Sequence, residues 1–325
     1  MELSVNYMGL KLKNPIIVGS SGLSKNIEGI KKLYENGAGA IILKSLFEEQ
    51  IIADSSKTLS HGQYAHTEAY DYVQNYTKDN TVDDYLELIS KAKAVTTIPI
   101  IASINCISDT EWISFAKKIQ IAGADALELN ISFLPSNDEI SSEQNEKIYF
   151  SIVEKIKEHI DIPIALKMSH YSSGLANLIK KLSWTQKVDS FTLFNKFYSP
   201  DINIDTLEIH SAGTFSTPED ISTSLRWIAL LSDKIKTPLV PSTGIHDGEG
   251  VIKQLLAGAT AVQTVSTIYK NGAEQIGKML EELKSWMEEN GYESIDDFRG
   301  AILDKKSNSQ YFERIQFMKY YSGIE

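Results

Sequence analysis

Cysteine is almost absent from this chain of 325 residues, in which Cys106 is the only one. A single thiol excludes a disulfide within the chain and a structural zinc site built on several thiolates. It also excludes an iron–sulfur cluster held by this chain alone, because such clusters take four cysteine ligands. We expect no metal site, and a reducing cytoplasm is the compartment that fits this cysteine usage.

Arginine and long apolar runs are scarce as well. Only Arg226, Arg299 and Arg314 occur, and the net charge is −11. With no basic stripe in the sequence, a nucleic acid is not an expected partner, and the acidic balance favours solubility. No segment approaches the roughly 20 apolar residues of a membrane-spanning helix, and Met1–Asn14 lacks the apolar core of a signal peptide. We therefore expect a cytoplasmic protein without a membrane span.

What the chain does contain is a rhythm of eight short apolar runs with helix-length spacers between them. Each run predicts a strand buried on both faces, because its apolar residues are continuous rather than alternating. Eight strand–helix units predict an α/β fold of the (β/α)8 barrel type, which often forms one domain, and we expect a single domain over residues 1–325. The runs are Pro15–Ser20, Ala40–Ser45, Pro99–Asn105, Ala126–Ser132, Pro163–Met168, Ser190–Asn195, Pro238–Thr243 and Ala259–Val265.

Three segments fall outside this rhythm. Leu3–Lys13 alternates apolar and polar residues and predicts a hairpin that closes the bottom of the barrel. Glu48–Thr81 and Lys196–Thr223 predict long inserted loops over the catalytic face, although an ordinary surface excursion explains the first equally well. Apolar spacing predicts helices at Ile27–Asn36, Val82–Val95, Asp109–Ala122, Glu143–His159, Pro218–Ser232, Gly248–Gly258 and Ala273–Asn290.

Two lysines, Lys44 and Lys167, end predicted strands. Chemistry in this fold is found at the C-terminal strand ends, and a lysine in a barrel mouth must meet an anion or lose its charge. Either lysine would stabilise an anionic cofactor ring or form a Schiff base with a carbonyl substrate. The alternative is a lysine that reaches solvent from a strand end, which we favour less for Lys167 because its run is otherwise apolar.

Three asparagines, Asn105, Asn130 and Asn195, end the third, fourth and sixth strands. A single asparagine at a strand end is usually a turn former. Three amides at one mouth suit a flat heterocycle with alternating donors and acceptors, such as a flavin, because an amide both donates and accepts hydrogen bonds.

Small polar residues follow the last two strands, in Ser242–Gly244 and Val265–Thr267. Barrels frequently bind phosphate at the loops after strands seven and eight, where small residues let backbone N–H groups approach an anion. We favour phosphate binding here over plain turns.

Taken in order, these motifs resemble the dihydroorotate dehydrogenases of pyrimidine synthesis, specifically the soluble FMN-containing class, over nearly the whole chain. The run Glu-Leu-Asn-Ile-Ser at 128–132 is fairly specific in this setting. The resemblance implies FMN across the barrel mouth, a homodimer, and hydride transfer from a substrate carbon to the flavin while a base removes the neighbouring proton. The other matching segments are Asn14–Ile17, Gly37–Ala40, Lys44–Ser45, Ala165–Lys167, Leu193–Asn195, Ser242–Ile245, Leu256–Thr260 and Phe298–Gly300.

The resemblance also implies roles for single residues. Lys167 would lie at the edge of the flavin ring, where its charge stabilises the reduced anionic flavin, and Gly213 would lie near the phosphate. Together with the strand-end reasoning, the predicted cofactor-binding residues are Ser20, Ser21, Lys44, Ser45, Asn105, Asn130, Lys167, Asn195, Gly213, Thr243, Gly244, Ser266 and Thr267. The residues predicted to act in catalysis are Lys44, Asn130, Ser132 and Asn195.

The family pattern breaks on the substrate side. In the soluble class the run at 128–132 is followed by Cys-Pro-Asn, and that cysteine is the base. Here Phe133 takes its position and cannot accept a proton, and Pro135 stands in the register of a substrate-binding asparagine. The loop after strand two has His66–Tyr70 where the family presents an asparagine-bearing substrate segment. The sequence therefore predicts a flavoprotein with altered or lost oxidation of dihydroorotate.

Several interpretations stay open. The other candidate bases are Ser132, Cys106, His66 and His170, and we do not favour any of them as the base. One variant of the enzyme still oxidises dihydroorotate, whereas the other, which we favour, takes a larger and less polar heterocycle that packs on Phe133. The alternatives of another class are a Schiff-base lyase or aldolase that uses Lys167 or Lys44, and a non-catalytic flavin-binding protein. Fumarate, NAD and quinone all serve as acceptors in the family, and the sequence disfavours only quinone.

Overall fold

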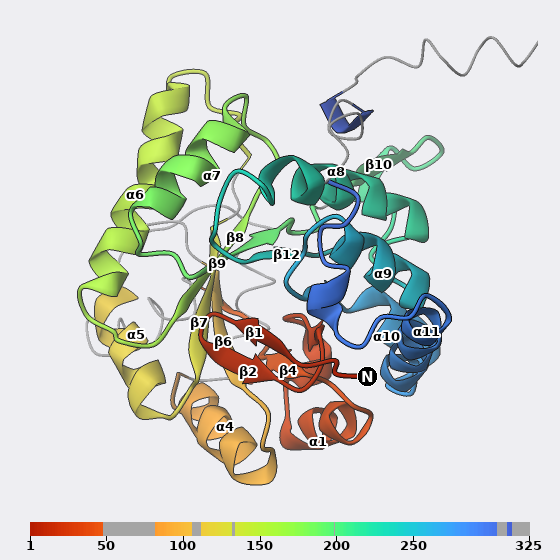
Figure 1. The fold of residues 1–325 in the computed structure, drawn as a ribbon. Coiled ribbons are helices and arrows are strands. Elements are labelled where there is room, and N and C mark those ends of the chain that lie inside the picture. The colour runs from red at the N-terminus through yellow and green to blue at the C-terminus, as the bar shows by residue number, and fades with distance from the viewer. Residues whose placement is uncertain (48–81, 106–111, 132–133, 198, 304–310, 314–325) are drawn as a thin grey trace, which may run out of the picture.

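The computed structural model describes residues 1–47, 82–105, 112–131, 134–197, 199–303 and 311–313. Within these residues eight parallel strands form a barrel with helices packed around its outside (Figure 1), which confirms the predicted (β/α)8 architecture. Each strand lies inside one of the eight predicted runs. The strands are β3 (Ile16–Val18), β4 (Ala40–Ile42), β6 (Ile100–Asn105), β7 (Ala126–Ile131), β8 (Ile164–Met168), β9 (Ser190–Leu193), β12 (Leu239–Pro241) and β13 (Val262–Thr264).

The sheet runs in the order β12-β9-β8-β7-β6-β4-β3-β13. Its two end strands meet through a parallel bridge between Ser242 and Gln263, and the N–H of Thr260 donates to the C=O of Leu239 at 2.9 Å. These contacts bring the ring to near closure. Every residue of β3, β4 and β8 is buried, because a barrel strand packs against the interior on one face and the helices on the other.

The strand register aligns the polar strand ends. Asn130 of β7 is opposite Asn105 of β6 on one side and Lys167 of β8 on the other, and Lys167 is opposite Thr192 of β9. In a parallel sheet the carboxyl ends of all strands lie at one edge. The register therefore places three of the predicted site residues in one row near the barrel mouth.

The helices follow the strands around the barrel and largely match the predicted ranges. Capping residues fix several starts: the Asn26 side chain accepts from the N–H of Gly29, and that of Asp247 accepts from the N–H of Gly250. Two helices, α7 and the short α10, were not predicted. The helices are α1 (Ile27–Glu35), α4 (Val82–Val95), α5 (Trp112–Ile121), α6 (Ser142–Lys157), α7 (Leu175–Trp184), α8 (Ile221–Leu231), α9 (Gly248–Leu256), α10 (Ser266–Asn271) and α11 (Gln275–Glu289), with 3-10 turns at Gly22–Ser24, Pro218–Asp220 and Ile295–Asp297.

The N-terminal hairpin is formed by β1 (Val5–Tyr7) and β2 (Leu10–Leu12), as predicted. It lies across one end of the barrel (Figure 1). The Tyr7 side chain is fully buried, and burial, followed by the negative charge of Glu128, raises the pKa of its phenol. Tyr7 thus fills the bottom of the barrel beneath the polar residues of the interior.

One of the two segments predicted to be long loops contains regular secondary structure. Lys196–Thr223 contains an exposed antiparallel hairpin, β10 (Pro200–Asn203) and β11 (Glu208–Ser211), so the expectation of a plain loop is wrong there. Every residue of these two strands, including the paired Ile202 and Ile209, is exposed. The sequence therefore shows no alternation of buried and exposed residues that would predict the hairpin. Glu48–Thr81 lies outside the described residues, apart from the two-residue β5 (Leu46–Phe47) before it.

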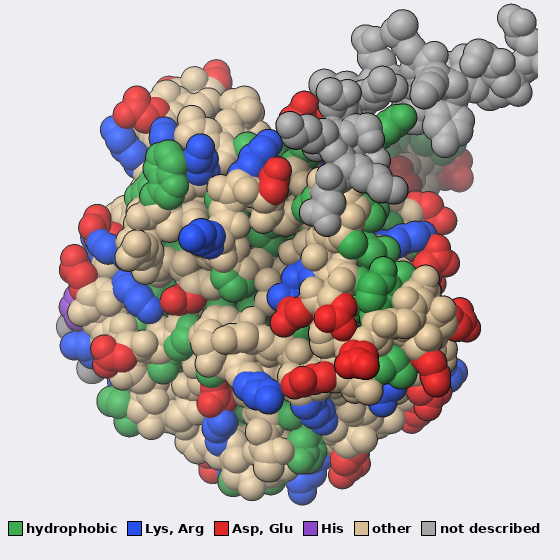
Figure 2. Space-filling view, in the orientation of Figure 1, with side chains coloured by type: hydrophobic (Ala, Val, Ile, Leu, Met, Phe, Trp, Pro, Cys, Tyr) green, Lys and Arg blue, Asp and Glu red, His purple; other side chains and the backbone are tan. Residues whose placement is uncertain are grey.

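No helix in the described part of the chain is long and apolar enough to cross a membrane. On the face drawn in Figure 2 acidic and basic side chains are interspersed, and acidic ones are numerous over the side where α9 and α11 lie.

Replacement of Tyr7 by Ala tests the hairpin as the closure of the barrel. Loss of a large aromatic side chain from a packed interior leaves a cavity, and we expect Tyr7→Ala to lower the free energy of unfolding by about 3–5 kcal/mol. The matched control is Asn6→Ala, on the exposed face of the same strand, which should change it by less than about 0.5 kcal/mol. Urea unfolding measures both, and equal losses would show that Tyr7 is not a core residue.

Candidate functional site

A cavity of about 410 Å³ opens at the C-terminal ends of the strands. Its walls come from segments far apart in the sequence, which only the closed barrel brings together. A cavity of this size suits a small-molecule ligand. The lining residues are Ser20, Lys167, Asn195, Lys196, Thr214–Ser216, Ser242–Ile245, Gln263–Ser266 and Tyr269.

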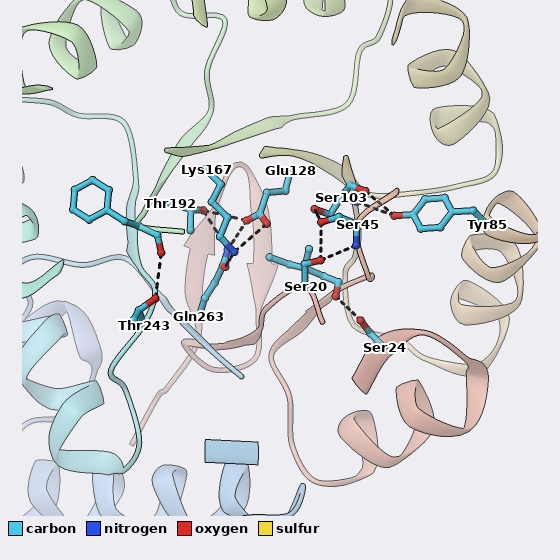
Figure 3. A network of polar contacts seen from close by, with 12 residues as sticks. Ser20, Ser24, Ser45, Tyr85, Ser103, Glu128, Lys167, Thr192, Thr243 and Gln263 are labelled. Carbon is cyan, nitrogen blue, oxygen red and sulfur yellow. Dashed lines mark hydrogen bonds and ion pairs between the residues drawn. The ribbon is translucent and has the colours of Figure 1, made fainter. Parts of the chain in front are cut away.

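A buried polar network lies at the floor of this cavity (Figure 3). Lys167 Nζ is 3.8 Å from Glu128 Oε1 and donates to Gln263 Oε1 at 3.4 Å. Gln263 Nε2 donates to Glu128 Oε2 at 2.6 Å, and Thr192 Oγ1 donates to the same carboxylate oxygen at 3.2 Å. Four strands, β7, β8, β9 and β13, thus meet through one carboxylate.

Both charged side chains of this network are buried or nearly so. Glu128 has no exposed side-chain surface and the Lys167 side chain is 9% exposed, so each charge depends on the other for compensation. Lys167 has three N–H donors, but among the described residues its one hydrogen bond is long, and Glu128 Oε1 accepts no hydrogen bond from them. The ammonium therefore has donor capacity left for a ligand that fills the cavity.

A chain of hydroxyl groups leads from Ser20, at the cavity edge, into the protein interior (Figure 3). Ser45 Oγ lies 2.9 Å from both Ser20 Oγ and Ser103 Oγ, and the N–H of Ser45 donates to Ser20 Oγ at 2.8 Å. The buried Tyr85 hydroxyl accepts from the N–H of Ser103 at 2.9 Å and donates to its C=O at 3.2 Å. These contacts hold Ser20 at the cavity edge and leave Ser45 behind it.

The turn after β12 has an unusual backbone. Thr243 and Gly244 both have positive φ, at 79° and 81°, a conformation that costs a residue with a side chain about 1–2 kcal/mol. A Cβ on Gly244 would lie 2.1 Å from the backbone N of Ile221. Only glycine therefore lets this turn pack against the start of α8 and line the cavity.

Next to this turn, Ser216 connects the loop after β11 to the end of β13. Its N–H donates to Ser266 Oγ at 2.9 Å, its hydroxyl is 3.1 Å from His246 Nε2, and its C=O accepts from Lys270 Nζ at 2.9 Å. Burial, with a smaller effect of Lys270, lowers the pKa of His246. This end of the cavity holds backbone amides and hydroxyls without a carboxylate among its lining residues, which suits an anionic group.

The structure brings six of the predicted site residues to the cavity wall: Ser20, Lys167, Asn195, Thr243, Gly244 and Ser266. Three others lie directly behind or beside it. Ser45 hydrogen-bonds to Ser20, and Asn130, which is nearly buried, pairs in register with Lys167 and with Asn105.

Four predicted residues lie elsewhere. Lys44 lines a separate cavity of about 200 Å³ with Lys25 and Asp84, and burial, followed by the charge of Lys25, lowers the pKa of its amine. Ser21 caps the 3-10 turn at Gly22–Ser24. Gly213 is exposed, and Thr267 is buried and donates to the C=O of His246 at 2.9 Å.

Of the residues named as candidate bases, His170 borders a neighbouring cavity rather than this one. Ser132, Cys106 and His66 lie outside the described residues, as does Phe133. Their predicted roles stay predictions. Within the described residues, no cluster of His, Cys, Asp or Glu side chains could hold a metal ion.

Three residues of the site were missed by the sequence reasoning. Glu128 was noted only as part of a motif, and Gln263 and Lys196 were not noted as site residues. The available signal was a glutamate and a glutamine within predicted buried strands, because a polar residue in a buried strand needs a partner. Lys196 carried no such signal, because it follows its strand in a predicted loop, where a lysine needs no buried partner.

The fold and this cavity define a class of protein, the (β/α)8 barrel enzymes with a cavity at the C-terminal face. The family model for dihydroorotate dehydrogenase matches residues 2–287. The chain belongs to the dihydroorotate dehydrogenase family, whose members are flavin-dependent in general.

Curated relatives match over nearly their whole length. The chain is 26% identical over 312 residues to the catalytic subunit of dihydroorotate dehydrogenase B (NAD(+)) of Thermoplasma volcanium, covering 94% of this chain and 99% of the relative. The proteins of the same name from Pyrococcus abyssi and Bacillus cereus are each 25% identical, covering 93% and 95% of this chain and 99% of each relative. The aligned region therefore spans the whole barrel rather than a single motif.

Replacement of Gly244 by Ala tests the close packing of the cavity turn. The new Cβ would strain the positive φ and also strike the backbone of Ile221, whereas Gly291→Ala has a similar φ and open space around it. We expect Gly291→Ala to cost about 1 kcal/mol and Gly244→Ala to cost clearly more, with loss of bound flavin as the turn shifts. Thermal unfolding and the flavin content of the purified proteins measure both effects, and equal behaviour of the two variants would contradict the packing described.

Proposed function

We propose that this protein is an FMN-dependent oxidoreductase that acts on a CH–CH bond of a small heterocyclic substrate, the reaction class of the dihydroorotate dehydrogenases. The observation that carries the proposal is the nearly buried Lys167, which Glu128 and Gln263 hold at the floor of a cavity at the C-terminal mouth. A cation with spare donors in that place is suited to an electron-accepting ring that becomes more negative on reduction.

The residues present fit FMN. Lys167 and Ser20 would hold the ring, with Asn130 beside them, and Gly244 and Ser266 would hold the phosphate at the end of the cavity that lacks carboxylates. Because Gly244 has no Cβ to strike Ile221, the turn can pack against the start of α8 and still line the cavity. FMN supplies a two-electron acceptor for a hydride when bound.

The protein residues would stabilise charge and orient the substrate. Lys167 stabilises negative charge at the cavity floor, and Glu128 and Gln263 fix the position of its ammonium group. Asn195, two residues after β9, lines the cavity and orients the substrate through its amide. The roles in catalysis that the sequence predicts for Lys44 and Ser132 are part of this proposal.

The proposed substrate differs from dihydroorotate. Phe133 occupies the sequence position of the family's base and has no proton-accepting atom, so we propose a heterocycle that is larger and less polar. The proposal includes a homodimer in the cytoplasm, with FMN in each subunit.

Anaerobic mixing of the flavin-loaded protein with dihydroorotate tests the function. We expect the visible absorbance of the flavin to persist with dihydroorotate and to bleach with dithionite, which shows a competent cofactor in a pocket made for another substrate. Bleaching by dihydroorotate would support the family's own reaction with a different base. A colourless protein that borohydride traps with a carbonyl substrate would overturn the proposal in favour of a Schiff-base enzyme.

Paired substitutions at Lys167 and Glu128 separate cofactor binding from stability. Lys167→Met leaves Glu128 buried and uncompensated, and we expect it to cost about 3–5 kcal/mol of unfolding free energy and to weaken FMN retention. The double variant Lys167→Met with Glu128→Gln removes both charges and should recover most of the stability without recovering FMN. Denaturant unfolding and FMN titration measure the two properties.

The control for this pair is Glu128→Gln alone. It keeps the cation and removes its counter-charge, so the midpoint potential of bound FMN should become more positive, by about 30 mV for each 1.4 kcal/mol gained by the reduced state of a two-electron couple. Retention of FMN by the double variant at the wild-type level would contradict the placement of Lys167 at the flavin.

Phe133→Cys tests whether the base alone is missing. If the rest of the substrate pocket were that of the family, a thiol at this position would restore proton abstraction and raise dihydroorotate oxidation by a factor of about 100 or more. We expect no gain, because other substrate-side positions differ as well. Phe133→Ala is the matched control, since it opens the same space without a base, and the flavin reduction rate with dihydroorotate is the measurement.

A further inference from the structure

A second cavity, of about 370 Å³, adjoins the mouth cavity. It lies among the loops after β8, β9 and β12 and the first residues of α8. Four residues line both cavities, namely Asn195, Lys196, Ser242 and Thr243. A molecule held in the second cavity would therefore share a wall with one held in the mouth.

Aromatic rings line much of this second cavity. The ring of Tyr171 lies 4.2 Å from that of His170 and 4.9 Å from that of Phe197, and the Tyr171 and Phe197 planes are at 83°. Phe194 lies 5.7 Å from His170, edge on. Burial lowers the pKa of His170 and so favours its neutral ring. These walls suit a flat apolar ring, because aromatic pairs prefer edge and offset contacts.

One lysine, Lys196, lies on the wall that the two cavities share. Lys196 is half-buried and, within the described residues, its ammonium makes no hydrogen bond or ion pair. The acidic residue on the same cavity wall, Asp220, is engaged elsewhere, because its carboxylate accepts from the N–H of Thr217 at 2.8 Å. A partly desolvated lysine without a counter-charge favours an anionic ligand group.

We propose that the second cavity binds the ring of a flat aromatic carboxylate, and that Lys196 at the junction binds its carboxylate group. The inference rests on the proposed function and deepens it, since it describes the substrate as an acid larger than dihydroorotate, whose aromatic ring lies in the second cavity while its CH–CH bond reacts in the mouth cavity. Lys196 is then a specificity-determining residue, and the rings of Tyr171 and Phe197 select the apolar part of the substrate.

Calorimetric titration of the flavin-loaded protein with naphthoate, and with the neutral naphthamide of the same shape, tests this site. We expect the wild type to bind naphthoate at least about tenfold more tightly than naphthamide, the factor that corresponds to a single charged contact. Lys196→Met should lose that preference and leave naphthamide binding within about twofold. Lys196→Arg should restore part of it, and Tyr171→Ala should weaken both ligands.

The matched control is Lys234→Met, an exposed lysine beyond the far end of α8, which should bind both probes like the wild type. Unchanged naphthoate binding by Lys196→Met, or no naphthoate binding by a wild type that retains FMN, would overturn the inference and leave the proposed function standing. Absence of FMN from the wild-type protein would instead overturn the proposed function, and the preference for naphthoate would still report on Lys196.

Discussion

The buried pair of Glu128 and Lys167 is the constraint on which the rest of the site depends. A carboxylate with no exposed surface is costly unless it is compensated, and here the compensation comes from β8, β9 and β13 together. The chain must therefore close its barrel in one register for this charge to be tolerated. The same register brings the polar strand ends into a single row, so stability and site geometry share one cause.

One end of the barrel is filled by a side chain, and the other end holds a cavity. Tyr7 of the N-terminal hairpin fills the bottom below Glu128, which keeps water from the charged pair on that side. At the mouth, serines, threonines and Gly244 line the cavity together with Phe215 and Tyr269, so hydroxyl groups as well as apolar side chains face open space. The tight contact of Gly244 with the start of α8 links that open face to the outer helices. The bottom is thus closed by a packed side chain, whereas the C-terminal face, where barrel enzymes have their sites, keeps an open cavity.

The sequence predicted the architecture and part of the site. Continuous apolar runs in β3, β4 and β8 are visible without coordinates, and Lys167 was noticeable because it interrupts such a run. The partnership of Glu128 with Gln263 was not predictable, because 135 residues separate them and each is one polar residue among many. The hairpin of β10 and β11 was missed for the opposite reason, since it covers no core and leaves no burial pattern.

By itself, the sequence determined the number and order of the strands, the closing hairpin and the presence of cations and amides at strand ends, because these depend on local patterning. Only the tertiary structure decided which of those residues meet. It brought Lys167 to the mouth cavity and Lys44 to a separate one, and it placed Lys196 on a wall shared by two cavities. The physical reason is that the direction of a side chain at a strand end is set by the turn that follows and by neighbours distant in the sequence.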